Sequence, residues 1–135
     1  MMDISSFDDL LVAAREQPEP QRLLFVFAGA GLPEDSSPEQ QASFAAGVGG
    51  ELTPMMTVDK SPASLTTFEE LSEEARQFGA DWSIAFVASL SGRNGSAPTE
   101  VETSRSLERM IEDIKRGMIG AFIPFDRAGQ LVRFV

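Results

Sequence analysis

The stretch RLLFVFA, residues 22–28, is apolar beyond its first residue and lacks the polar alternation of a half-exposed strand. A second stretch, SIAFVA at residues 83–88, has the same character. Continuous apolar runs of this length are typical of strands that are buried on both faces of a sheet. We therefore expect both stretches to be central strands of the fold.

The first run leads into Gly29-Ala30-Gly31, which has the outline of a nucleotide-binding loop. A dinucleotide fingerprint needs a third glycine and a helix directly behind it, so that backbone N–H groups meet the pyrophosphate. Here Glu34 stands in place of the third glycine, Asp35 follows it, and Pro33 has no N–H to donate. Because the carboxylates repel a pyrophosphate, we interpret the glycines as a strand-to-loop turn and expect no cofactor.

Four segments around these runs carry helix signals. Apolar side chains at helical spacing follow a Ser5 or Ser6 cap, and Pro18 ends that segment. Capping residues and closing glycines mark three more segments. The predicted helices cover residues 7–14, 37–47 and 67–79, and a segment from Thr99 or Thr103 to Arg116.

Weaker strand signals complete the pattern. MMTVD, residues 55–59, follows Pro54, and two runs near the end flank a turn at residues 126–129. The chain of 135 residues matches the size of one ordinary domain. Alternating helices and strands predict a single α/β domain, residues 1–135, with a mainly parallel sheet covered by helices and a closing antiparallel β-hairpin.

The composition excludes several functions. The chain has no histidine, cysteine or tyrosine, so it lacks an imidazole base, a thiol nucleophile and a His or Cys metal site. Its net charge of -10 argues against nucleic-acid binding, which depends on neutralising phosphates. Residues 1–100 carry 16 acidic and 5 basic side chains, whereas residues 101–135 carry 5 acidic and 6 basic ones. Only the last third is suited to an anion.

The sequence also predicts a location. No apolar run approaches the roughly 20 residues that span a bilayer. The N-terminus lacks the basic and apolar regions of a secretory signal, and there is no cysteine for a disulfide. We therefore expect a cytoplasmic protein that does not bind membranes.

In a parallel sheet, the carboxyl ends of the strands bring polar residues to one edge, where open α/β sheets bind ligands. A small-molecule site would lie there, near Gly29, Ser89 and Ser91, but we favour the alternative of a merely solvated rim, because loops after strands are polar in any soluble protein. Asp59 and Asp126 suit magnesium, since hard cations prefer carboxylate oxygens, but we predict no metal site. The candidate ligand-binding residues are Asp59, Lys60, Arg93 and Asp126.

Several stretches together resemble a family of short proteobacterial proteins, and the resemblance covers nearly the whole chain. These stretches are ISSFDDLLVAAREQPEPQRLLFVFAGAGLP, TPMMTVDKSP, RQFGADWSIAFVASLSGR and IGAFIPFDRAGQ. Members often bear the name ribonucleotide reductase subunit alpha. That activity requires cysteines for the thiyl radical and the reducing dithiol, and this chain has none, so we reject it. The family implies no catalytic motif.

These observations favour a non-catalytic α/β module that acts through protein contacts, with another protein or with a second copy as a homodimer. The alternative is a small-molecule-binding protein or enzyme with its site at the carboxyl ends of the strands. An exposed apolar patch without a cleft would favour the first function. A deep cleft lined by Asp59, Arg93 and Asp126 would favour the second.

Overall fold

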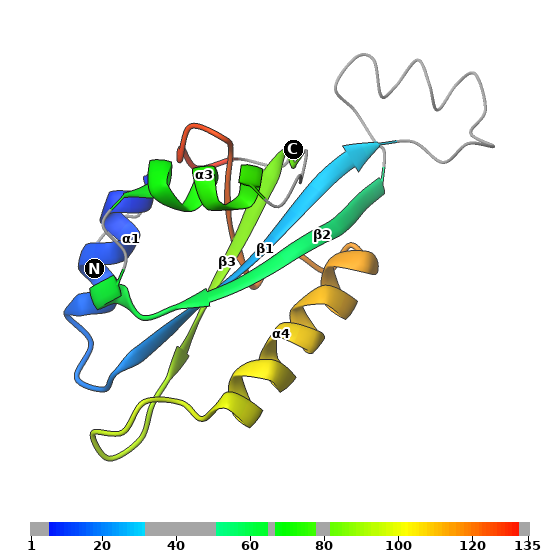
Figure 1. Ribbon diagram of the computed structural model, residues 1–135. Coiled ribbons are helices and arrows are strands. Elements are labelled where there is room, and N and C mark those ends of the chain that lie inside the picture. The colour runs from blue at the N-terminus through cyan, green and yellow to red at the C-terminus, as the bar shows by residue number, and fades with distance from the viewer. Residues whose placement is uncertain (1–5, 32–50, 65–66, 78–81, 133–135) are drawn as a thin grey trace.

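The computed structural model describes residues 6–31, 51–64, 67–77 and 82–132. They form a four-stranded sheet with the order β2-β1-β3-β4, and all three strand pairs are antiparallel (Figure 1). The elements in chain order are α1 (Phe7–Arg15), β1 (Gln21–Gly31), β2 (Glu51–Lys60), the 3-10 helix η1 (Pro62–Ser64), α3 (Phe68–Gln77), β3 (Ile84–Ser91), α4 (Glu100–Lys115) and β4 (Ile123–Phe125).

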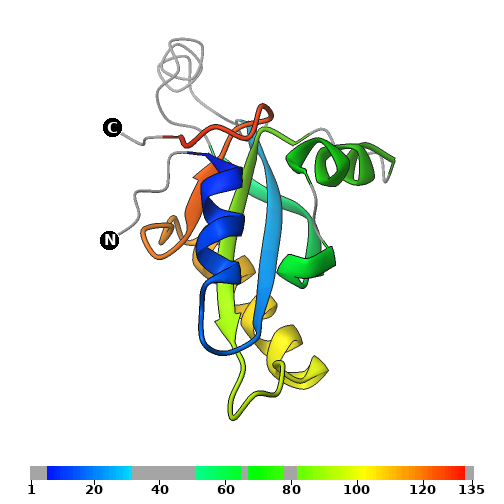
Figure 2. The same cartoon turned by 90° about the vertical axis from the view of Figure 1, so that its left-hand side faces the viewer.

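The prediction of a mainly parallel sheet is wrong. The two apolar runs are the central strands β1 and β3, as expected, but they pair antiparallel, with Phe25 opposite Val87. Helices cover both faces of this sheet: α1 and α3 lie on one side and α4 on the other (Figure 2). A continuous apolar run therefore indicates that a strand is covered on both faces. It does not indicate whether the strand is parallel or antiparallel to its neighbours.

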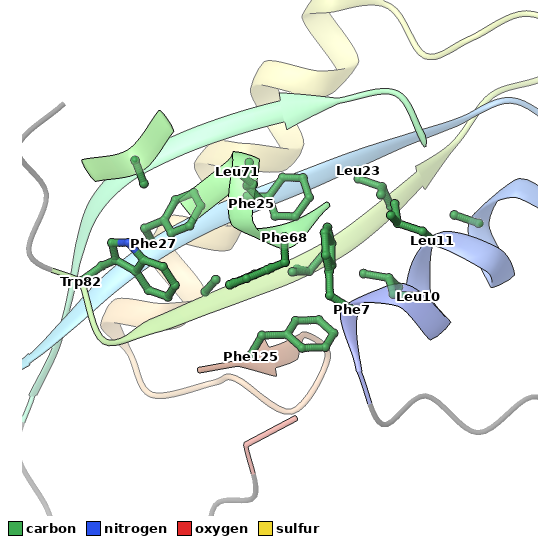
Figure 3. Close-up of a cluster of buried hydrophobic side chains, with 14 residues drawn as sticks. Phe7, Leu10, Leu11, Leu23, Phe25, Phe27, Phe68, Leu71, Trp82 and Phe125 are labelled. Atoms are coloured by element: carbon green, nitrogen blue, oxygen red, sulfur yellow. The ribbon is translucent and has the colours of Figure 1, made fainter. Parts of the chain in front are cut away.

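An aromatic cluster fills the space between the sheet and the pair α1 and α3 (Figure 3). Phe7 of α1 lies at its centre and is 1% exposed. Its ring makes edge contacts with Phe25, Phe68 and Phe125, at centroid distances of 6.0, 5.0 and 5.8 Å. One side chain thus joins α1 to β1, α3 and β4.

A smaller apolar cluster lies between the sheet and α4. The buried Met110 and Ile114 of α4 pack on Leu24 and Val26, which alternate with the β1 residues that face the aromatic cluster. The helix begins at the Thr99 cap, one of the two predicted starts, and closes at Gly117, which has a positive φ of 76°. No helix of the described residues is long and apolar enough to cross a bilayer.

The other predicted helices have mixed outcomes. Ser6 caps α1, whose buried residues are the four apolar residues that predicted it. The buried face of α3 also matches the prediction, although Phe78 and Gly79 lie outside the described residues. The predicted helix at 37–47 lies outside them as well.

Strand β2 is longer than predicted and contains a bulge. Phe27 lies opposite Met56, but the next residue, Ala28, lies opposite Pro54, so Met55 is the extra residue. The bulge changes which face the side chains point to. Leu52 packs with the α4 cluster, whereas Met56 and Val58, beyond the bulge, pack against the aromatic cluster. Strand β1 also extends through Gly31, so the glycines predicted as a turn pair with the start of β2.

Two tight turns shape the ends of the sheet. After β3, Arg93 and Ser96 exchange backbone hydrogen bonds of 2.9 Å across Asn94 and Gly95, both of which have positive φ. After β4, the chain turns at 126–129, and Val132 returns to donate its N–H to the Pro124 carbonyl at 2.9 Å. This second turn is the short predicted hairpin.

Candidate functional site

The predicted ligand residues Asp59 and Lys60 are neighbours on β2 and point to opposite faces of the sheet. Asp59 accepts a 2.7 Å hydrogen bond from Nε of Arg22, on the side of α4. Lys60 reaches Glu74 of α3, with 3.1 Å between its Nζ and the nearer carboxylate oxygen. Both pairs are about one-third exposed, and ion pairs at this exposure contribute roughly 0–1 kcal/mol.

Arg93 lies beyond β3, beside the start of α4. Its side chain is 85% exposed, and its guanidinium lies 3.8 Å from the Glu102 carboxylate. Glu102 and Thr99 form the capping box of α4. Hydrogen bonds from the backbone N–H and hydroxyl of Thr99 lower the pKa of Glu102, and the charge of Arg93 lowers this pKa further. This cluster therefore stabilises the start of α4.

Asp126 caps the closing turn. One carboxylate oxygen accepts the backbone N–H groups of Ala128 and Gln130, at 2.9 and 3.0 Å. Asp126 follows Phe125 of β4, which lies opposite Ala85 of β3, and Ala85 in turn lies opposite Phe27 of β1. Asp59 of β2 lies opposite Leu24 of β1. The structure therefore does not bring the four predicted residues together. Asp59, Lys60 and Arg93 follow or end strands at one end of the sheet, but Asp59 and Lys60 point to opposite faces. Asp126 lies toward the other end, because β4 runs antiparallel to β3 and not parallel to it as predicted.

We expect Asp126→Ala to lower the free energy of unfolding by about 1 kcal/mol, because two backbone N–H groups lose their acceptor. Arg93→Ala is the matched control. It should change the free energy of unfolding by no more than about 0.5 kcal/mol, as for other exposed side chains. Urea unfolding followed by tryptophan fluorescence measures both values. Equal losses at the two positions would contradict the role given to Asp126.

A different surface combines an open sheet edge with a groove. Strand β2 runs for ten residues along one border of the sheet, with α4 beside it (Figure 1). Among the described residues, no strand pairs with its outer side. At the opposite border, β4 has only three residues, and a bridge between Phe125 and Leu131 covers part of its outer side. β2 is therefore the long open edge of the described sheet.

Pro54 and the Met55 bulge interrupt the first half of this edge. Proline removes a hydrogen-bond donor, and bulges disturb pairing, so both features limit indiscriminate contact with other strands. From Met56 to Lys60 the register with β1 is regular. Among the described residues, the outer side of that half has no strand beside it. In the sequence, Pro54 made this strand less certain, and the structure places it at an edge, where a proline is tolerated.

A groove of about 510 Å³ lies between the first half of β2 and the end of α4. Leu52, Pro54 and Ile114 provide its apolar lining, while Lys115 and Arg116 provide positive charge. Among the described residues, neither cation has an ion-pair partner. Lys115 and Arg116 belong to residues 101–135, the part of the chain that the charge distribution marked as suited to an anion, whereas the opposite wall of the groove comes from β2.

The end of α4 is held in a fixed conformation beside this groove. The N–H of Met118 bonds to the Asp113 carbonyl at 2.8 Å, and the N–H of Gly117 bonds to Ile114 at 3.0 Å. These two bonds form a Schellman motif, in which the residue at the position of Met118 usually packs back on the helix. Here Met118 is 62% exposed, and Met55 on β2 is 46% exposed. Exposed methionines are adaptable contacts for a partner.

Comparisons with protein-family models, curated proteins and solved structures gave no match. The residues that the structure describes define a small α/β domain with a four-stranded antiparallel sheet, in which one long edge strand has no outer neighbour. The resemblance to short proteobacterial proteins stays a prediction.

Proposed function

We propose that the protein acts without catalysis, as a module that binds an extended polypeptide along the open edge of β2. The observation that carries the proposal is the ten-residue edge strand whose outer side has no partner among the described residues. Added strands gain affinity from main-chain hydrogen bonds and specificity from pockets for alternate side chains. The regular stretch Met56–Lys60 would supply the main-chain hydrogen bonds, and the groove beside α4 would supply a pocket for side chains.

The predicted small-molecule site at the strand ends receives less support. Asp59, Arg93 and Asp126 already serve Arg22, the α4 cap and the closing turn, respectively. The groove beside β2 is lined by other residues. Exposed Met55 and Met118 add apolar contact surface near it, as a polypeptide partner would use.

Selection from a library of short random peptides tests the proposal. Bound peptides should slow hydrogen exchange of backbone amides within Met56–Lys60. Met55→Lys removes apolar contact surface between the regular stretch and the groove and adds a charge there, so it should weaken the binding of these peptides by about tenfold or more. Val12→Lys on α1 is the matched control, because Val12 is 44% exposed and lies on a different face. A selection without binders, or protection confined to other elements, would contradict the proposal.

A second copy of the chain can also supply the added strand, which would make the protein a homodimer. Light scattering at high concentration should then give twice the mass of one chain, and Met55→Lys should restore the single mass. If the unmodified protein has the mass of one chain and the selection yields peptides that bind, the partner of the β2 edge is a different polypeptide and not a second copy.

A further inference from the structure

A second hollow, of about 160 Å³, lies on the other side of α4. It exists because β4 is short: the strand pairs with Ala85–Val87 only, so within the described residues the end of β3 has no neighbour on that side. The apolar lining comes from β1, β3, α4 and the segment before β4. These residues are Leu24, Ala88, Leu90, Met110 and Phe122.

Two opposite charges border this hollow from one helix face. Arg109 and Asp113 both line it and stand four residues apart on α4. Such residues are neighbours on a helix, yet among the described residues neither has an ion pair or a side-chain hydrogen bond. Arg76 and Glu73 on α3, by contrast, pair with each other at 2.8 Å. The charges at the hollow are therefore both available to a ligand.

The helix end fixes the backbone that carries Asp113. The Asp113 backbone carbonyl accepts the Met118 N–H at 2.8 Å within the motif that closes α4. Met110, between the two charged residues, is 3% exposed and anchors this turn of the helix in the core. Arg109 and Asp113 thus project from a helical turn whose backbone is held by the core and by the closing motif.

The geometry points to a site for a small zwitterion with an apolar tail, namely a free α-amino acid with an aliphatic or aromatic side chain. The carboxylate would pair with the Arg109 guanidinium and the ammonium with the Asp113 carboxylate. The side chain would enter the apolar hollow. An apolar cavity of about 150 Å³ accepts benzene in another protein, so the volume suits a side chain of this size. This site is independent of the edge of β2.

NMR titration with leucine tests the assignment, and three analogues separate its parts. The analogues are 4-methylpentanoate, which lacks the ammonium, 3-methylbutylamine, which lacks the carboxylate, and glycine, which lacks the tail. Leucine should shift the amide resonances of Leu90 and residues 109–113, and each analogue should bind about tenfold more weakly, the effect of losing roughly 1.4 kcal/mol. An analogue that binds as well as leucine would overturn the zwitterion assignment.

Variants locate the binding. Arg109→Gln and Asp113→Asn should each weaken leucine binding by about tenfold, because each removes one charge pair. Arg105→Gln is the matched control: Arg105 is an exposed arginine of the same helix that does not line the hollow. Circular dichroism confirms that each variant is folded. Unchanged binding in both charge variants, or no leucine-dependent shift in the unmodified protein, would overturn the proposal.

Discussion

Gly92→Ala should lower the free energy of unfolding by about 3 kcal/mol, the upper part of the range for groups added at tightly packed positions. A Cβ at Gly92 would lie 2.0 Å from the Ser96 carbonyl oxygen and 3.0 Å from that of Pro20. Both obstacles are backbone atoms, so no side chain can rotate away. The Gly92 N–H also bonds to the Pro20 carbonyl at 2.8 Å. The methyl group must therefore displace either the turn after β3 or the segment that leads into β1.

Urea unfolding followed by Trp82 fluorescence measures this loss. Gly120→Ala is the matched control, since nothing lies within 4 Å of a Cβ at Gly120. Its effect should stay within about 0.5 kcal/mol. If both variants unfold at the same urea concentration, the close approach at Gly92 is not a feature of the folded protein in solution.

Phe7→Ala should cost about 3–5 kcal/mol, the usual range for removing a buried phenylalanine. Phe7 is fully covered, and its three edge-to-face partners come from three different elements. Aromatic pairs contribute roughly 0.5–1.5 kcal/mol each beyond the area that they bury. Removal of the Phe7 ring would also leave a cavity where α1 packs on the rest of the fold.

The control for Phe7 lies on the same helix. Val12 is 44% exposed, so Val12→Ala should change the free energy of unfolding by less than about 1 kcal/mol. Phe7→Leu should fall between the two, because it keeps most of the apolar volume. A loss below about 1.5 kcal/mol for Phe7→Ala would mean that α1 is not anchored by this ring.

Local features of the fold were predictable from the sequence because they depend on neighbouring residues. The apolar spacing of Phe7, Leu10, Leu11 and Ala14 identifies the buried face of α1. Thr99 and Gly117 bound α4 through hydrogen bonds that close within a few residues. Strand direction has no such local signal. Side chains alternate between faces in the same way in parallel and antiparallel strands, so the apolar run of β1 carries no information about its partner's direction.

The candidate site failed to form for the same reason. Asp59 and Lys60 are adjacent in the sequence, and strand alternation alone places them on opposite faces. Arg93 follows β3 at the same end of the sheet, because β2 and β3 both run antiparallel to β1, whereas Asp126 follows β4 at the other end. The open edge of β2 depends on strand order, which is a property of the whole chain. Only Pro54 gave a local indication of it.

The bulge at Met55 makes β2 a member of both layers of the molecule. Leu52 and Pro54 belong to the layer of α4, and Met56 and Val58 belong to the layer of the aromatic cluster. The backbone is continuous between them, and packed interiors transmit strain because they compress little. A load on the groove would therefore be felt in the phenylalanine core, because the bulge at Met55 joins the strand residues of the two layers.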